Sequence, residues 1–246
     1  TSGVIMTNDS DVQAPPVPEE WHLWLDGVHD PAYNMAADEV LLATAASRGR
    51  PLLRVYSWDR LAVSIGYIQR RDAAPAGFAV VRRPTGGGVV YHDYDYTYTV
   101  VLPPEHWLAG LDRVKSYDWI NRSVQAGLTA LAVSAELADQ VIPHNIDRLS
   151  MICFKNPTKF DILVGDRKIA GSAQRRTHDG ILHQGSIHFG GPLPYERSAM
   201  TQALIRGFAN IMAVTMIDYH PADDFFAAVA RCRADKYATD AWNGRR

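Results

Sequence analysis

The chain has 246 residues, of which 47% are hydrophobic and 21% charged, a composition typical of a globular protein with one sizeable core. Its formal net charge of −2, without a basic stretch, argues against nucleic-acid binding, and no apolar run approaches the roughly 20 residues of a membrane span. Two cysteines are too few for a disulfide framework or a four-cysteine zinc site. We therefore expect a cytoplasmic protein with reduced thiols.

Residues 1–20 are rich in Pro, Asp and Ser and lack a signal-peptide pattern, so we expect a disordered arm before a single domain over 21–246. Within that domain, apolar spacing and turn residues predict alternating strands and helices. Strands are expected at 22–25, 52–56, 61–67, 78–82, 96–102, 160–164, 167–174 and 181–189, and helices at 30–46, 116–132, 198–214 and 223–237. Helices interleaved with hairpins predict an α+β fold, with a mixed, largely antiparallel sheet flanked by helices.

Residues 82–93 have the sequence RRPTGGGVVYHD, which is the first segment typical of a binding site. Glycine has no Cβ, so the backbone N–H groups of three successive glycines can close on a ligand. The segment is neither a P-loop nor a dinucleotide fingerprint, because it lacks Gly-Lys-Ser/Thr and a strand rather than a helix follows. A loose hairpin turn is the alternative, but the Arg82-Arg83 pair and His92 beside Asp93 favour a ligand-binding loop.

A lysine and a histidine in the second half of the chain are further candidates. Lys168 follows a tight turn in a strand of small and apolar residues. It either projects into a cleft to bind an oxygen or is an edge-strand lysine that limits aggregation, and the local sequence alone favours the second. His183 is a base, a ligand or a core histidine, and the local sequence favours the core. The spacing of His178, His183 and His188 does not indicate a metal site.

The two cysteines have different surroundings in the sequence. Cys153 lies in a predicted loop directly before a strand, whereas Cys232 shares a helix face with Phe225 and Val229. A loop cysteine is a nucleophile where cations lower its pKa, but a free cysteine is most often a small buried hydrophobe. We expect Cys232 in the core, and both interpretations remain open for Cys153.

Taken together, these segments resemble the lipoate ligase and octanoyltransferase family, which shares its catalytic domain with biotin ligases. The resemblance runs from about Trp21 to Phe189 and rests on four blocks in the same order. They are NMAADE at 34–39, RRPTGGG with YHD within 82–93, KIAGSAQ at 168–174 and HQGS at 183–186. The resemblance implies a biotin/lipoate ligase-like fold with the acyl chain in an apolar tunnel and the glycine loop around its carboxyl end.

The resemblance also implies roles for individual residues. Cys153 and Lys168 are expected to be catalytic, with Lys168 on the acyl carbonyl. Substrate binding is expected from Arg82, Arg83, Thr85, Gly86, Gly87, Gly88, His92, Gly171, Ser172, Ala173, His183 and Gly185. No metal ligand is predicted. The block His183-Gln184-Gly185 departs from the two-histidine or Gln-His versions common in the family, which leaves the role of its second position open.

The sequence favours the cysteine-dependent transferase branch. Residues 153–161, CFKNPTKFD, resemble the pattern Cys-Phe-x-x-Pro-x-x-Tyr-Glu/Asp of that branch, with Phe160 in place of tyrosine. The other octanoyltransferase branch has its cysteine after the histidine block, where this chain has none before Cys232. The chain length also leaves no room for the full extra C-terminal domain of many bacterial ligases. We expect octanoyl or lipoyl transfer through a Cys153 thioester, with no cofactor.

The implied partners are acyl carrier protein, or another lipoyl domain, as donor and a lipoyl-domain lysine as acceptor. The acceptor is a glycine cleavage H protein or a 2-oxoacid dehydrogenase acyltransferase subunit. Such partners are acidic, so Arg70-Arg71 and Arg175-Arg176 are either a basic docking face or scattered solvated charges. The nearest alternative is a lipoate ligase that uses ATP and Mg to form lipoyl-AMP. A non-catalytic acyl-binding protein and a biotin ligase are further alternatives, and the glycine loop argues against the biotin ligase.

Overall fold

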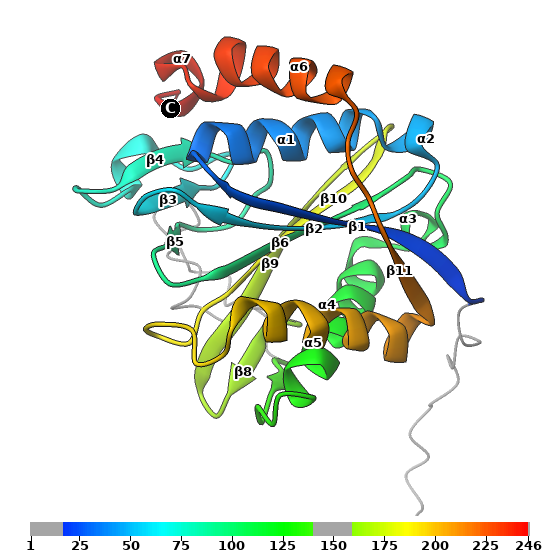
Figure 1. Cartoon of the computed structure of the whole chain (residues 1–246). Coiled ribbons are helices and arrows are strands. Elements are labelled where there is room, and N and C mark those ends of the chain that lie inside the picture. Colours follow the sequence, from blue (N-terminus) through cyan, green and yellow to red (C-terminus); the bar gives the residue numbers. More distant parts are fainter. Residues whose placement is uncertain (1–16, 140–158, 246) are drawn as a thin grey trace, which may run out of the picture.

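The computed structural model describes residues 17–139 and 159–245, and Figure 1 shows how their elements are arranged. These residues form one eight-stranded sheet, one three-stranded sheet and flanking helices. The predicted α+β fold with a mixed, largely antiparallel sheet is confirmed. None of the helices in these two ranges is long and apolar enough to cross a membrane.

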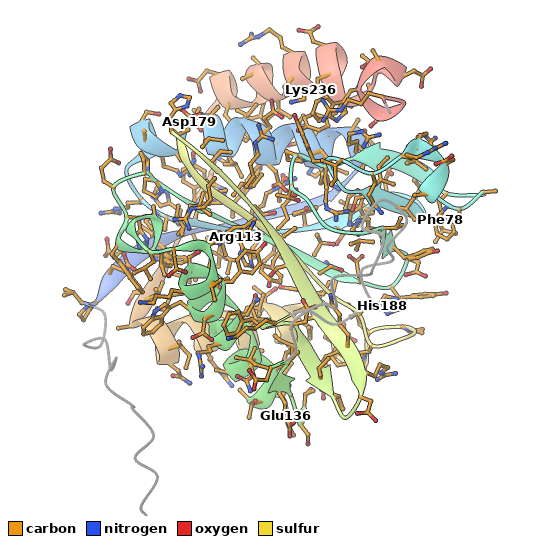
Figure 2. All side chains as sticks on the ribbon, turned by 180° about the vertical axis from the view of Figure 1, so that it is seen from behind. Phe78, Arg113, Glu136, Asp179, His188 and Lys236 are labelled. Carbon is orange, nitrogen blue, oxygen red and sulfur yellow. The ribbon has the colours of Figure 1, made fainter. Side chains whose placement is uncertain are left out.

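The large sheet has the strand order β11-β1-β2-β6-β10-β9-β8-β7. Its strands are β1 (Glu19–His29), β2 (Leu52–Trp58), β6 (Tyr96–Leu102), β7 (Glu136–Leu137), β8 (Ile162–Val164), β9 (Arg167–Thr177), β10 (Gly180–Ile187) and β11 (Val214–Asp218). β11, β1 and β2 run parallel, and the remaining neighbours pair antiparallel. β9 and β10 form a long hairpin through a turn at His178-Asp179, and Figure 2 marks Asp179 at that turn and His188 just beyond the other end of β10.

The small sheet lies beside the large one and carries the glycine loop. Its order is β4 (Ala79–Arg82), β3 (Ala62–Ile65) and β5 (Val90–His92), with β3 parallel to β4 and antiparallel to β5. Residues 83–89 connect the two outer strands and therefore cross the end of β3. This topology brings Ser64 of β3 beside Val90 of β5.

Helices cover both faces of the large sheet (Figure 1). On one face α1 (Pro31–Ala43) packs on the sheet, and α6 (Asp223–Cys232) and α7 (Asp240–Asn243) lie above it. On the other face lie α4 (Arg113–Thr129) and α5 (Arg197–Met212). The shorter elements are α2 (Ala45–Arg48), η1 (Arg71–Ala73), α3 (Trp107–Gly110) and the π-helical turn η3 (Arg233–Tyr237).

The two faces of the sheet bury separate apolar cores. Met35 and Leu41 of α1 meet Phe225 and Val229 of α6 in one cluster. The other joins the sheet to α4 and α5 through side chains such as Val124, Leu204 and Phe208. Because strand side chains alternate between faces, successive residues of β10 point toward different cores.

Several predicted boundaries are wrong. The strand β1 begins at Glu19, inside the predicted N-terminal arm. The predicted helix 30–46 is two helices, separated by Thr44, and the predicted helix 198–214 ends at Met212. Val214 instead starts β11, which pairs with β1 from the opposite end of the chain. Such a short strand depends on a distant partner, so local spacing could not predict it.

Candidate active site

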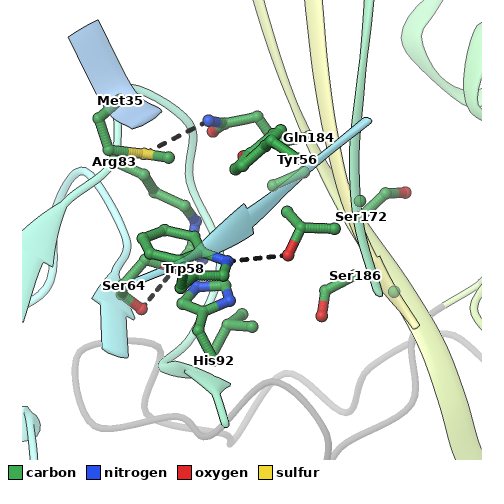
Figure 3. Close-up of a pocket in the computed structure, with 14 residues that line it drawn as sticks. Met35, Tyr56, Trp58, Ser64, Arg83, His92, Ser172, Gln184 and Ser186 are labelled. Carbon is green, nitrogen blue, oxygen red and sulfur yellow. Dashed lines mark hydrogen bonds between the residues drawn. The ribbon is translucent and has the colours of Figure 1, made fainter. Parts of the chain in front are cut away.

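A pocket of about 420 Å³, counting the solvent at its mouth, lies where α1, the small sheet and the strands β9 and β10 meet (Figure 3). It is lined by Met35, Tyr56, Trp58, Ser64, Arg83, Val90, His92, Thr97, Gly171, Ser172, Ala173, Gln184, Gly185 and Ser186. Each of the four sequence blocks contributes to this lining, although the blocks are separated by up to about 150 residues of chain. The lining contains six of the twelve predicted binding residues. They are Arg83, His92, Gly171, Ser172, Ala173 and Gly185, whereas Arg82, Thr85, Gly86, Gly87, Gly88 and His183 are not part of it.

Gln184 connects three of the four blocks. Its side-chain amide nitrogen donates to Asp38 at 2.7 Å, and its amide oxygen accepts from the Thr85 hydroxyl at 2.6 Å. Met35 lies beside it at the pocket wall (Figure 3). Gln184 is buried, so losing either partner would leave a buried polar atom unsatisfied. The residue that departs from the common family pattern thus links α1 to the glycine loop.

Asp38 is in turn held by a fully buried arginine. Arg54 donates to Asp38 at 2.6 Å and to Asp26 at 2.5 Å, and it also binds the backbone oxygen of Asn34 at 2.9 Å. Two carboxylates around one guanidinium form a buried ion-pair cluster, in which each carboxylate compensates the burial of the cation. Sequence reasoning missed Arg54 and Asp26, since a single arginine in an apolar strand gives no local signal of its partners.

Arg83 shapes the glycine loop from inside. Its guanidinium donates to the backbone oxygens of Gly86 at 2.6 Å and Gly88 at 2.7 Å, and to that of Ser64 at 2.8 Å. Gly87 has a φ of +88°, a conformation that favours glycine. A Cβ on Gly66 would lie 2.0 Å from the backbone oxygen of Gly87, so Gly66 must also be a glycine for the loop to pack there. Arg83 thus lines the pocket and also fixes the path of the loop.

Arg82 has a different environment from its neighbour. It does not line the described pocket; its buried guanidinium binds backbone oxygens of Gln69 at 2.5 Å, Trp242 at 3.1 Å and Arg245 at 2.6 Å. The side chain therefore joins the segment after β3 to the C-terminal end of the described chain. A substrate contact for Arg82 remains a prediction.

Lys168 lies directly behind Gly171, which lines the pocket. Its ammonium forms a buried ion pair with Asp161 at 2.7 Å. A Cβ placed on Gly171 would lie 2.7 Å from the Lys168 nitrogen, so the absence of that side chain makes room for the ammonium beside the pocket. Asp161 was not predicted as a site residue, although it ends the segment that carries Cys153.

His92 stands in a hydrogen-bonded series of side chains. Its Nε2 lies 2.8 Å from the Ser64 hydroxyl and its Nδ1 2.8 Å from the Asp95 carboxylate. The same Asp95 oxygen accepts from Thr97 and Ser186, each at 2.8 Å. Burial raises the pKa of Asp95, but the attraction of His92 and these hydrogen bonds outweigh it, so its pKa is lowered and it stays a carboxylate. Sequence reasoning missed Ser64 and Asp95.

His183 does not line the pocket with its ring. The ring is fully buried near Tyr98 and Tyr117, with ring centroids 6.5 and 5.1 Å away. Burial lowers its pKa to about 3, so the imidazole is neutral near pH 7. This position agrees with the core interpretation of the local sequence. Gly185, its neighbour but one, lines the pocket, and a Cβ there would lie 2.1 Å from Tyr98.

The cysteines divide between the described and undescribed parts of the chain. The proposed nucleophile Cys153 lies outside the described residues. Cys232 packs at the edge of the α1–α6 core, where burial raises its pKa to about 11. A thiol with that pKa is almost entirely protonated near pH 7 and is a poor nucleophile.

A buried lysine beside a pocket that a three-glycine loop borders, on a mixed sheet with helices on both faces, defines a catalytic domain of the lipoate ligase class. The chain belongs to the lipoyl protein ligase A/B catalytic domain family, whose model matches residues 30–217. The predicted family is confirmed.

Relatives and solved structures support this assignment. Octanoyltransferase LipM of Staphylococcus aureus is 37% identical over 182 positions, which cover 69% of this chain and 66% of that protein. Octanoyltransferase LipM of Halalkalibacterium halodurans is 30% identical over 93% of this chain and 100% of that protein. A lipoate-protein ligase A bound with ATP has the same fold, with a TM-score of 0.77 at 22% identity over 92% of this chain and 98% of that one. Both relatives carry the octanoyltransferase name, in agreement with the predicted branch.

Proposed function

We propose that this protein transfers an octanoyl group, or a lipoyl group, to a lysine of a lipoyl domain through a thioester on Cys153. The observation that carries the proposal is the buried Lys168 ammonium, which packs against Gly171 in the lining of a pocket built from all four family blocks. Two relatives carry the name octanoyltransferase, and the alignments cover 66% and 100% of their lengths. Their name supports octanoyl as the acyl group and acyl transfer as the reaction.

In the first half-reaction the Cys153 thiolate attacks the acyl thioester of the donor. A bond forms between the Cys153 sulfur and the acyl carbon, the donor's C–S bond breaks, and the donor leaves as a thiolate. Exchange of one thioester for another is nearly thermoneutral, so no ATP is consumed. Lys168 stabilises the negative charge on the acyl oxygen, and a preorganised donor of that kind contributes about 3–4 kcal/mol.

In the second half-reaction the acceptor lysine attacks the acyl-enzyme. The C–N bond forms, the C–S bond to Cys153 breaks, and the amide product makes the step effectively irreversible. Asp161 keeps the Lys168 ammonium in place throughout, because breaking their buried ion pair is costly. We expect Gly86, Gly87 and Gly88 to close around the acyl end, and Arg83 holds the backbone oxygens of Gly86 and Gly88.

We further propose acyl carrier protein as the donor and a glycine cleavage H protein or a 2-oxoacid dehydrogenase acyltransferase subunit as the acceptor. The reaction needs no cofactor and takes place in the cytoplasm. The alternative is an ATP-dependent lipoate ligase, for which ATP and Mg would be required and Cys153 would not.

Intact-protein mass spectrometry after mixing the enzyme with octanoyl-acyl carrier protein, without ATP, tests the proposal. An octanoyl adduct that neutral hydroxylamine removes and Cys153→Ala abolishes supports it. Cys232→Ala is the matched control, since its protonated, half-buried thiol should not carry the acyl group and the adduct should persist. Modification of a lipoyl domain that appears only with lipoate and ATP would overturn the transferase and establish the ligase.

A further inference from the structure

The second half-reaction produces a proton that the residues assigned so far do not accept. An amine that becomes an amide loses one N–H proton as the C–N bond forms, and a positioned base accelerates such a step. The base must lie at the pocket, where the acceptor amine meets the acyl group. The inference below therefore rests on the proposed function.

The pocket offers few groups that can exchange this proton. Among its described lining residues, those with a titratable side chain are Tyr56, Arg83 and His92. Burial and the charge of Asp38 raise the pKa of Tyr56 well above its usual range. Arg83 is a permanent cation held by backbone oxygens. Lys168 lies behind Gly171, outside the lining, and pairs with Asp161. His92 is the remaining candidate in this part of the chain.

The surroundings of His92 have the geometry of a working base. Asp95 is a carboxylate and accepts only, so the Nδ1 atom carries the hydrogen and the Nε2 lone pair accepts from Ser64 at 2.8 Å. The imidazole ring stacks on Trp58 with centroids 3.8 Å apart and planes 17° from parallel. Figure 3 shows Ser64, His92 and Trp58 together at one side of the pocket.

The charges around the group fit that role. Asp95, directly before β6, lies 2.8 Å from the imidazole, and its carboxylate favours a positive charge on the ring. Arg83 donates to the Ser64 hydroxyl oxygen at 3.2 Å, which favours negative charge on that oxygen. Arg197 of α5 donates to the backbone oxygen of Asp95 at 3.2 Å and holds that residue in place. Serine, histidine and aspartate in this order are the arrangement by which hydrolases move a proton from a hydroxyl.

We propose that Ser64 and His92 form a catalytic proton relay for the acceptor lysine, with Asp95 as the positioning residue. As the amine nitrogen bonds to the acyl carbon, its proton passes to the Ser64 oxygen while the Ser64 hydroxyl proton passes to His92 Nε2. The bond to Cys153 breaks and the sulfur leaves as a thiolate. The imidazolium then returns its proton to solvent, so the relay is ready for the next turnover.

The test separates the two half-reactions. Enzyme is loaded with octanoyl from octanoyl-acyl carrier protein, and transfer to a lipoyl domain is followed in a single turnover. In His92→Gln the rate of transfer to lysine should fall roughly 10²- to 10⁴-fold, and it should fall by more than the rate of loading does. Asp95→Asn should reduce the same step, because it no longer fixes the ring's proton on Nδ1. His188→Gln is the matched control, a histidine paired with Asp93 at 3.1 Å outside the pocket lining, and should transfer normally.

Chemical rescue distinguishes a base from a structural support. Added imidazole should raise the rate of transfer to lysine in His92→Ala at least tenfold. It should not change the rate at which that variant is loaded. An unchanged transfer rate in His92→Gln, or a transfer defect in His92→Ala that imidazole does not relieve, would overturn the relay.

A third outcome would assign a different role to Ser64. An acyl adduct that survives neutral hydroxylamine and disappears in Ser64→Ala would be an oxyester, so Ser64 would be a nucleophile and the relay would be wrong. Failure of the proposed function is recognised separately, since the unaltered enzyme would then neither load nor transfer without ATP.

Discussion

The position of the Lys168 ammonium depends on a glycine, Gly171, three residues further along strand β9. The space for the ammonium exists only because Gly171 has no Cβ. A new methyl group would meet the end of Lys168 and, at 3.2 Å, a carboxylate oxygen of Asp161, so it would push the ammonium out of its buried ion pair. The position of the ammonium at the pocket would be lost as well.

We therefore expect Gly171→Ala to slow octanoyl transfer by roughly 10²-fold or more, as for the loss of one oxyanion donor. The free energy of unfolding should fall as well, by up to roughly 3–5 kcal/mol, because the displaced ammonium leaves the Asp161 carboxylate buried without its cation. Transfer kinetics and urea unfolding on the same preparation measure the two effects. Gly110→Ala, where nothing lies within 4 Å of the new methyl group, is the control and should retain full activity.

The proportion of the two effects decides the interpretation. Slower transfer with an unchanged free energy of unfolding would show that the ion pair with Asp161 survives and that only the position of the ammonium changes. Full activity would contradict the view that the Lys168 ammonium acts at this wall.

At the scale of elements, α1 is joined to the sheet by charge as well as by apolar packing. Asp38 of α1 and Asp26 of β1 both bind Arg54 of β2 inside the protein. Asp38 also receives hydrogen bonds from Thr99 at 2.8 Å and from Gln184. The helix is therefore positioned against three strands by one buried network, and Gln184 transmits that position to the glycine loop.

Removal of the cation should be costly, because Arg54→Met leaves two buried carboxylates without the guanidinium that both of them bind. We expect the free energy of unfolding to fall by roughly 3–5 kcal/mol. Guanidinium-induced unfolding followed by circular dichroism measures this. Arg60→Met removes an arginine from an exposed pair with Asp59, and should leave stability nearly unchanged, because solvent screens such a pair. Equal effects of the two substitutions would refute the structural role of the network.

A second link between elements runs through Arg82, which joins the segment after β3 to α7. Ending the chain at Thr239 would remove the backbone oxygens of Trp242 and Arg245 that this buried guanidinium binds. We expect the shortened protein to unfold at least about 2 kcal/mol more easily, because a charged group loses buried partners. Denaturant unfolding measures the loss, and an unchanged midpoint and slope would show that α7 does not support the small sheet.

At the scale of the whole molecule, buried titratable groups make stability depend on pH. The pKa of His183 is lowered by burial from 6.5 to about 3, and that of His22 is lowered by burial and by Arg48 and Arg50. In the unfolded chain these imidazoles take up protons below about pH 6.5, while folded His183 stays neutral. The unfolded state then binds more protons, so stability falls as the pH falls.

For His183 alone this difference amounts to about 2 kcal/mol between pH 7 and pH 5. We expect the unfolding free energy to decrease over that range, and His183→Gln to flatten the decrease whatever its effect at pH 7. His178→Gln, with a side chain 91% exposed, should leave the slope unchanged. The check is a series of urea titrations between pH 5 and 8, in which an identical slope for His183→Gln would contradict the buried neutral imidazole.

A second group acts at lower pH with the same sign. The lowered pKa of Asp95 means that its stabilising charge is fully present above about 3.8 and is lost as the pH falls through the lower folded value. Acid unfolding should therefore begin with the histidines and be completed as carboxylates such as Asp95 are protonated.

The amino-acid sequence alone determined the family, the α+β fold and the four blocks, because glycine runs, a lysine among small residues and strand alternation are local patterns. Half of the predicted binding residues also line the pocket. The strand β11 and the partners Asp161, Asp95, Ser64 and Arg54 were decided only by the tertiary structure. Their roles arise from hydrogen bonds and ion pairs between residues far apart in the chain or on different elements. Local sequence does not indicate which buried charged residue of a distant strand will become the partner of a given side chain.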